Sequence, residues 1–90
     1  MEQNFKVGDI VISKSGHDKN RPFIVVSIDK NGYLVIIDGR HRLREKPKTK
    51  NPKHLMKIAY DETILNKINS PLATNAEIYK MIKAYNKIKE

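Results

Sequence analysis

The sequence contains no cysteine, and this absence excludes two classes of structure. Without thiols the chain has neither a disulfide framework nor a thiolate metal site. Its three histidines, His17, His41 and His54, lack the short spacing of metal ligands, so we expect no metal and no other cofactor. A chain without cysteine also fits a reducing compartment, and we therefore expect a cytoplasmic protein.

Long apolar runs and targeting segments are missing as well. Apolar runs such as Leu34 to Ile37 are far shorter than the roughly 20 residues that a membrane-spanning helix needs. The sequence begins Met-Glu-Gln-Asn-Phe-Lys and has no basic segment followed by an apolar one, the pattern of a signal peptide. We therefore expect no membrane partner.

Catalytic motifs are also absent. The sequence has no nucleophile elbow, no Walker loop and no glycine fingerprint for dinucleotides, and no spacing pairs its carboxylates. Its 90 residues suffice for one small domain but not for a deep substrate cavity in addition. We expect a protein that is not an enzyme and has no small-molecule substrate. A small enzyme is a weaker alternative than the two binding functions that are given at the end of this subsection.

Positive charge is what the sequence has in excess, and it is concentrated in one segment. The net charge is +8, yet residues 1–39 sum to zero and residues 58–90 to +1. Residues 40–57 hold eight basic side chains and one acid, Glu45, a net charge of +7. Such a block is either a solvated segment or a surface that binds a polyanion. Because it lies between two strand-like segments, we favour the binding surface.

Short β-branched segments separated by turn residues predict a mainly β domain. We expect five strands, at residues 7–14, 23–29, 33–37, 40–45 and 54–60. We expect Asn31-Gly32 to form a two-residue hairpin turn and Asp38-Gly39 a second turn, with polar loops at 15–21 and 48–52. Five short strands in residues 1–60 favour a small SH3-like barrel that is closed or nearly closed, because closure hides the edge strands.

Residues 61–90 are expected to form a helical extension that packs on this barrel. A short helix opens at Asp61 and ends before Pro71, and Thr74 with Glu77 has the pattern of a capping box. The apolar residues that follow fall on one helical face: Ile78, Met81, Ile82, Tyr85 and Ile88. We expect this face to dock on the barrel, with the binding of a partner as the alternative.

The basic segment alternates strictly. Its every second position is basic: Arg40, Arg42, Arg44, Lys46, Lys48 and Lys50. In an extended chain these side chains would share one side, spaced about 6.6 Å apart, while Leu43 would point inward. Such a ridge suits the phosphates of a nucleic acid, and arginine adds bidentate phosphate contacts and stacking on bases. The alternative is an edge strand with cations that merely face solvent.

The loop at 15–21 is the second candidate surface. Gly16 is expected to take a positive φ, and His17, Lys19 and Arg21 add donors at the barrel rim. An ordinary polar loop is the alternative interpretation. Lys53 and His54, which follow the ridge, complete the expected RNA-binding set.

The order of these motifs resembles a KOW motif over residues 6–58. The resemblance rests on these segments: Gly8-Asp9-Ile10-Val11, Ser13-Lys14-Ser15-Gly16-His17-Asp18-Lys19, Pro22-Phe23-Ile24-Val25-Val26, Leu34-Val35, Asp38-Gly39-Arg40 and Lys50-Asn51-Pro52-Lys53-His54-Leu55. They look like the small bacterial KOW proteins similar to the KOW-type large-subunit ribosomal protein family of archaea and eukaryotes. Many KOW motifs have a second glycine before the second strand, where this chain has Arg21-Pro22.

The resemblance implies an SH3-like barrel, no catalysis, and RNA as the ligand, with ribosomal RNA and ribosomal proteins as the expected partners. In KOW proteins the loops beside the motif glycine contact RNA or protein, which here implies Gly16 and its neighbours. We therefore expect an RNA-binding protein of translation or ribosome assembly. The alternative is a protein-interaction adaptor, a transcription- or translation-factor module whose basic surface only steers association.

Overall fold

The computed structural model describes residues 4–89, and the side chains of residues 4–86. The strands in this part of the chain are β1 (Asp9–Ser13), β2 (Pro22–Ile28), β3 (Leu34–Ile37), β4 (Lys48–Lys50) and β5 (Leu55–Tyr60). The helices are η1 (Pro52–His54), α1 (Glu62–Ile68), α2 (Asn75–Ile82) and η2 (Lys83–Lys89), of which η1 and η2 are 3₁₀ helices. The expected mainly β fold with helices at its C-terminal end is confirmed.

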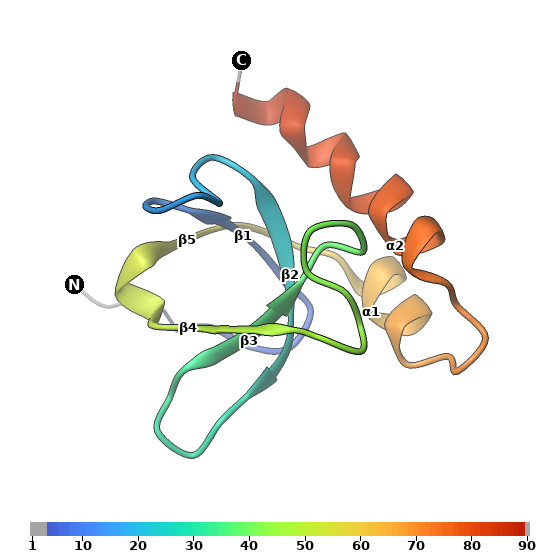
Figure 1. Cartoon of the computed structure of the whole chain (residues 1–90), viewed down its shortest axis with the longest axis horizontal. Coiled ribbons are helices and arrows are strands. Elements are labelled where there is room, and N and C mark those ends of the chain that lie inside the picture. The colour runs from blue at the N-terminus through green and yellow to red at the C-terminus, as the bar shows by residue number, and fades with distance from the viewer. Residues whose placement is uncertain (1–3, 90) are drawn as a thin grey trace.

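The strands form one antiparallel sheet in the order β4-β3-β2-β1-β5. β1 pairs with both β2 and β5. Register shifts beside Val11 and Val25 interrupt the pairing, and such bulges bend a sheet. The sheet is strongly curved (Figure 1), but it is not closed, because no pairing between described residues joins β4 to β5.

Apolar side chains pack against both faces of the sheet. One cluster joins the sheet to the helices and contains Ile10, Ile24, Ile37, Ile64, Ile78 and Ile82. The other contains Val11, Phe23, Val25, Leu34, Ile36 and Leu55. Neighbouring residues of a strand point to opposite faces, which explains why Ile10 and Val11 belong to different clusters. The apolar face of the C-terminal helix therefore docks on the sheet, whereas the side chain of Ile88 lies outside the described residues.

The two helices begin where the sequence predicts. Asp61 caps α1 by accepting a hydrogen bond from the backbone N–H of Ile64 at 3.0 Å. Thr74 and Glu77 form the complete capping box of α2. Tyr85 of η2 donates to Asp61 at 2.5 Å, and burial together with this hydrogen bond raises the pKa of Tyr85 to about 12.

No helix among residues 4–89 is long and apolar enough to cross a membrane.

The expected strand at 40–45 is wrong, as is the loop expected at 48–52. Residues 40–45 form turns with an isolated bridge between Leu43 and Lys46, and the fourth strand is Lys48–Lys50. The buried carboxylate of Asp38 accepts hydrogen bonds from three successive backbone N–H groups, those of residues 40–42, at 2.8–2.9 Å. This local bonding replaces strand pairing. Leu43, expected to point inward, is only half-buried.

The hairpin between β2 and β3 is one residue longer than predicted. Gly32 has a φ of +85°, but Asn31 does not take a positive φ, so the two-residue turn is not formed. Instead, Asp29 accepts hydrogen bonds from the N–H groups of Asn31 and Tyr33, both at 2.9 Å. A three-residue loop that ends in a left-handed glycine is the next common hairpin type.

Candidate functional site

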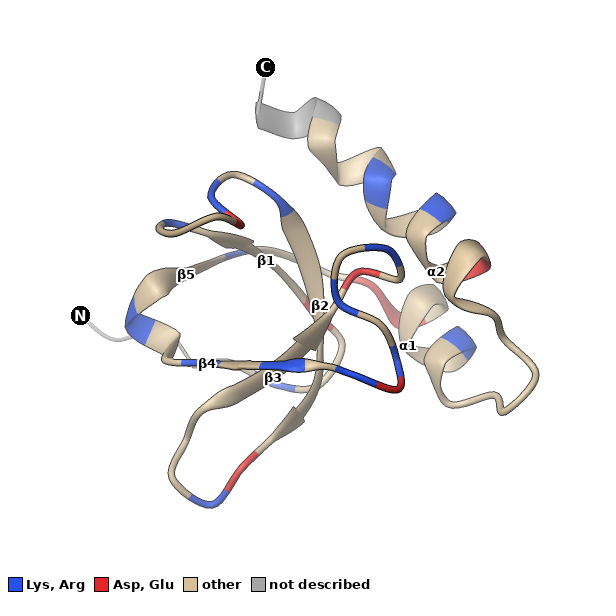
Figure 2. Ribbon diagram, viewed as in Figure 1, with Lys and Arg blue, Asp and Glu red and all other residues tan. Residues whose placement is uncertain are grey.

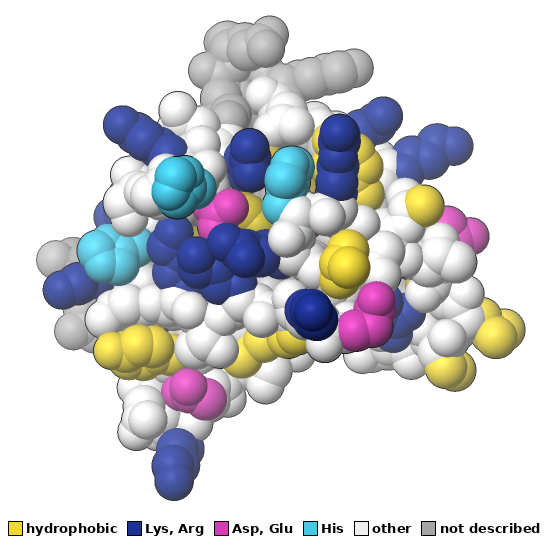
Figure 3. Space-filling view, in the orientation of Figure 1, with side chains coloured by type: hydrophobic (Ala, Val, Ile, Leu, Met, Phe, Trp, Pro, Cys, Tyr) yellow, Lys and Arg dark blue, Asp and Glu magenta, His cyan; other side chains and the backbone are white. Residues whose placement is uncertain are grey.

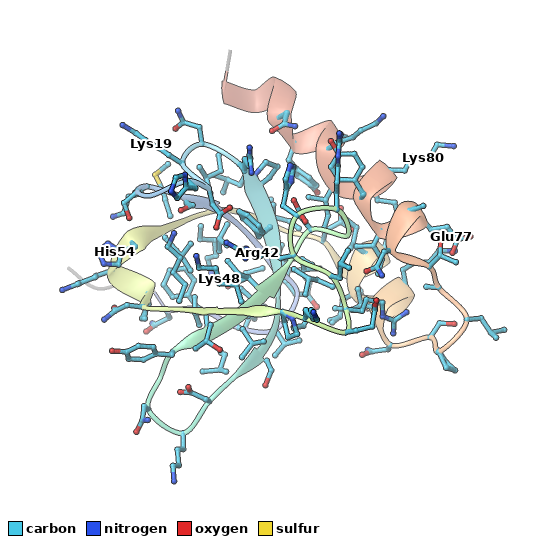
Figure 4. All side chains as sticks on the ribbon, viewed as in Figure 1. Lys19, Arg42, Lys48, His54, Glu77 and Lys80 are labelled. Atoms are coloured by element: carbon cyan, nitrogen blue, oxygen red, sulfur yellow. The ribbon has the colours of Figure 1, made fainter. Side chains whose placement is uncertain are left out.

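Asp18 is the centre around which basic side chains gather. Its carboxylate oxygens lie 3.2 Å from Arg42 Nη2, 3.5 Å from Lys48 Nζ and 3.7 Å from Arg21 Nη1. The Asp18 side chain is only 3% exposed, whereas those of its three partners are 33–43% exposed. The cations therefore cover the carboxylate and still present part of their surface to solvent. Figure 4 shows Arg42 and Lys48 near the middle of the molecule in this view.

Lys50 connects this group to the loop between β1 and β2. Its Nζ donates to Ser13 Oγ at 2.7 Å and to the carbonyl oxygen of Ser15 at 3.1 Å. Gly16, which has the expected positive φ of +79°, lies beside it, since a Cβ at that position would be 4.0 Å from Lys50 Nζ. Burial, followed by repulsion from Lys48, lowers the pKa of Lys50.

We call Arg21, Arg42, Lys48 and Lys50, together with Asp18, the basic cluster. Four cations against one carboxylate leave it a net charge of +3. Burial acts to raise the pKa of Asp18, but the hydrogen bond and charge of Arg42, with those of Lys48, outweigh burial and hold that pKa below its usual value. The carboxylate is therefore ionised at neutral pH, and it fixes the guanidinium of Arg42 in place.

The basic cluster unites the two surfaces that the sequence suggested separately. Figure 2 shows the basic positions along the chain from the loop after β3 to η1 and in the loop between β1 and β2. In the space-filling view, lysine and arginine side chains gather around an acidic group in the middle of one face, with histidines beside them (Figure 3).

The expected straight ridge of six cations is not formed, because residues 40–47 turn instead of extending. Arg42, Lys48 and Lys50 belong to the basic cluster, whereas Arg40, Arg44 and Lys46 do not. Lys46 is exposed and outside the described contacts of the cluster. Strict alternation in the sequence thus arises from residues with different surroundings.

Arg44 binds the segment that connects α1 to α2 and is not part of the basic cluster. Its guanidinium donates to the carbonyl oxygens of Ile68 at 2.9 Å, Ser70 at 3.1 Å, and Ala73. These carbonyls belong to the end of α1 and the connection to α2, where backbone acceptors lack helical partners. The arginine closes this connection, so we assign it a structural role.

The other expected site residues lie around the basic cluster. Lys19 and His54 lie toward the edge of the face that has Arg42 and Lys48 near its centre (Figure 4). His17 is exposed on the same loop as Lys19, and Lys53 is exposed on η1. The backbone of His54 accepts a hydrogen bond from Lys14 N–H at 2.8 Å, which attaches η1 to the end of β1.

Arg40 points toward the helices and contacts an aromatic ring that sequence reasoning missed. Its Nη1 lies 3.3 Å from the hydroxyl of Tyr79, and its guanidinium carbon lies 5.4 Å from the centre of that ring. Lys83 Nζ lies 5.9 Å from the same ring centre. Sequence reasoning also missed Asp18 as a site residue. The signal that could have found it is its position as the one acidic residue between Asp9 and Asp29.

Metal ligation has no support in the part of the chain that the structure describes. No group of three or more histidine, cysteine, aspartate or glutamate side chains there is placed to hold a metal ion. The cations of the basic cluster can form charge-assisted hydrogen bonds to an anion.

Asp18→Asn should lower the free energy of unfolding at pH 7 by about 1–3 kcal/mol, less than for a fully buried pair because the cations are partly solvated. Because the pKa of Asp18 is lowered in the folded state, its stabilisation is present above the unfolded pKa of about 3.9 and is lost as pH falls through the folded pKa. Urea unfolding of parent and variant at neutral pH and near pH 3 measures both effects.

Glu62→Gln, at an exposed carboxylate in the first turn of α1, is the matched control for loss of one negative charge. It should change stability by only a few tenths of a kcal/mol. If the difference between parent and Asp18→Asn is as large near pH 3 as at pH 7, Asp18 does not act through its charge.

Comparison of the chain with models of known protein families gave no match, and comparison with curated proteins gave none either.

Proposed function

We propose that this protein is an RNA-binding module of the KOW type with an SH3-like barrel, and that the basic cluster holds RNA phosphates. The observation that carries the proposal is the convergence of Arg21, Arg42, Lys48 and Lys50 around the single carboxylate of Asp18. The surplus positive charge of this group calls for an anionic partner, and RNA offers regularly spaced phosphates.

The position of the basic cluster supports the KOW interpretation. Lys50 contacts Ser15 beside Gly16, the motif glycine whose neighbouring loops are expected to contact RNA. The curved antiparallel sheet of five short strands also fits an SH3-like barrel. Ribosomal RNA, with a role in translation or ribosome assembly, is the ligand that the resemblance favours.

Orientation of the arginines also favours phosphate binding. Asp18 accepts one hydrogen bond from Arg42 and lies close to Arg21, which leaves other guanidinium donors of a partly exposed Arg21 for a ligand. An arginine held in place loses less entropy for each hydrogen bond that it forms. Phosphates bound in this way report the shape of an RNA, since side chains do not reach into the deep major groove of A-form helices.

The structure gives less support to the protein-adaptor alternative. One of its forms used the apolar stripe of the C-terminal helix as a partner-binding face. Ile78 and Ile82 of that stripe are buried in the cluster between helix and sheet, so they are not available to a partner in this fold.

The salt dependence of RNA binding tests the proposal. Replacing both Arg42 and Lys48 with Gln should flatten the slope of log affinity against log salt by about 1.5, because each lost phosphate contact removes about 0.7–0.9. Binding of a structured ribosomal RNA fragment is measured over a salt series. Replacing Lys30 and Lys80 with Gln removes the same charge from exposed positions outside the cluster and should change the slope much less.

Thermal melting shows whether the double variant is folded. If it is not folded, the single variant Lys48→Gln replaces it in the salt series. Equal loss of slope in the cluster and control variants would mean that net charge, and not the basic cluster, attracts RNA. An affinity independent of salt would contradict phosphate binding altogether.

A further inference from the structure

A cleft lies between the basic cluster and the C-terminal helices. It has a volume of about 150 Å³ and includes Arg21, Pro22, His41, Tyr79, Ile82 and Lys83 in its walls. The loop after β3 forms one side and α2 with the start of η2 the other, and Figure 1 shows that loop beside α2. Arg21 belongs both to this cleft and to the basic cluster, so the two are continuous.

The walls of the cleft combine flat apolar surface with positive charge. Pro22 and Ile82 are buried and apolar, and the half-buried ring of Tyr79 stands beside them. Lys83, in the wall of the cleft, places its charge 5.9 Å from the centre of that ring. Arg40, outside the walls, places its guanidinium carbon 5.4 Å from the same centre. Neither cation forms an ion pair with another of the residues 4–86 described with side chains.

A polar group with a fixed orientation completes the cleft. His41 Nδ1 lies 3.0 Å from Asp38 Oδ2, and the other oxygen of Asp38 is held by three backbone N–H groups. With Nδ1 engaged, Nε2 is the ring nitrogen left to face a ligand. The imidazole thus offers a hydrogen bond near a flat ring and two cations.

We propose that this cleft binds one unpaired base of single-stranded RNA, with the base stacked on Tyr79 and its flanking phosphates held by Arg21 and Lys83. This inference rests on the proposed function and adds its ligand class. Unpaired bases stack on aromatic rings, and Tyr79 supplies one in the wall of the cleft. Bases inside a duplex are already stacked and paired, so the cleft selects single strands.

Separating base contacts from phosphate contacts tests the inference. An oligouridylate and a ribose-phosphate oligomer of the same length without bases carry the same phosphates. The parent protein should bind the oligouridylate more tightly by a factor of roughly 5 to 100, the effect of stacking about one base. Tyr79→Leu should remove this preference and leave the salt slope unchanged.

Tyr60→Leu is the matched control. Tyr60 is also partly exposed and also has a cation over its ring, with Lys6 Nζ 4.2 Å from the centre, but it is outside the cleft. Its replacement should leave the preference for bases intact. Tyr79→Trp gives a second measurement if Tyr79→Leu does not fold, because the chain has no other tryptophan. Its fluorescence should change with the oligouridylate and not with the oligomer that lacks bases.

The outcomes distinguish the two proposals. Equal, salt-dependent affinity of the parent for both oligomers overturns the cleft as a base site and leaves phosphate binding by the basic cluster standing. A preference for bases that survives Tyr79→Leu also overturns it. If the parent binds neither these oligomers nor structured RNA even at low salt, the proposed function fails, and the inference fails with it.

Discussion

Gly39→Ala should lower the free energy of unfolding by about 2–5 kcal/mol, from left-handed strain and overpacking together. Gly39 has a φ of +85°, and a Cβ there would overlap the carbonyl oxygen of Asn75 and lie 2.7 Å from the backbone nitrogen of Tyr79. Both obstacles are backbone atoms of α2, which a side-chain rotation does not move. The helix must shift, and urea unfolding measures the cost.

Gly32→Ala separates the contact from the strain. Gly32 has the same φ of +85°, but no atom lies within 4 Å of a Cβ built there. Its replacement should cost only about 1–2 kcal/mol, the penalty of left-handed backbone. Equal losses for the two variants would mean that α2 yields freely at Gly39. If Gly39→Ala shifts α2, that variant should also weaken the preference for bases, since Tyr79 is on α2.

Arg44→Ala should lower the free energy of unfolding by about 2–4 kcal/mol without changing the salt slope of RNA binding. The variant leaves the carbonyls of Ile68, Ser70 and Ala73 without their charged donor. Hydrogen bonds to charged groups contribute about 1.5–3 kcal/mol each when buried, and partial exposure of this set limits the total. Urea unfolding and the RNA salt series measure the two parts of the prediction.

Arg40→Ala is the control for Arg44→Ala, because it removes an exposed arginine of the same loop. It should change stability by about 0.5 kcal/mol or less. If Arg44→Ala instead flattens the salt slope by about 0.7–0.9, the loss of one phosphate contact, Arg44 binds phosphate and our structural assignment is wrong.

Local patterns predicted most of the secondary structure. β-Branched runs mark β1, β2 and β3, and Thr74 with Glu77 marks the start of α2, because strand and cap signals arise from neighbouring residues. The segment after β3 could not be predicted in this way. Alternating cations suggested an extended chain, but the carboxylate of Asp38 competes for the same backbone N–H groups.

The site was predicted as residues but not as an arrangement. Sequence position singled out both Arg42 and Arg44, yet only contacts with distant segments send one to Asp18 and the other to the carbonyls around Ser70. No local pattern in the sequence indicated Tyr79, because its place in the cleft depends on the β3–β4 loop that packs beside it. Tertiary packing decides what each of these side chains does.

The shared cluster of sheet and helices has a consequence for synthesis on the ribosome. Ile10, Ile24 and Ile37 are made early, whereas their cover, Ile78 and Ile82, is made after the last strand is complete. At about 5–20 residues per second, the stretch from Tyr60 to Ile82 takes about 1–4 seconds to translate. Until Ile82 is made, the apolar side chains of Ile10, Ile24 and Ile37 lack the cover of α2, and a chaperone has an apolar segment to bind.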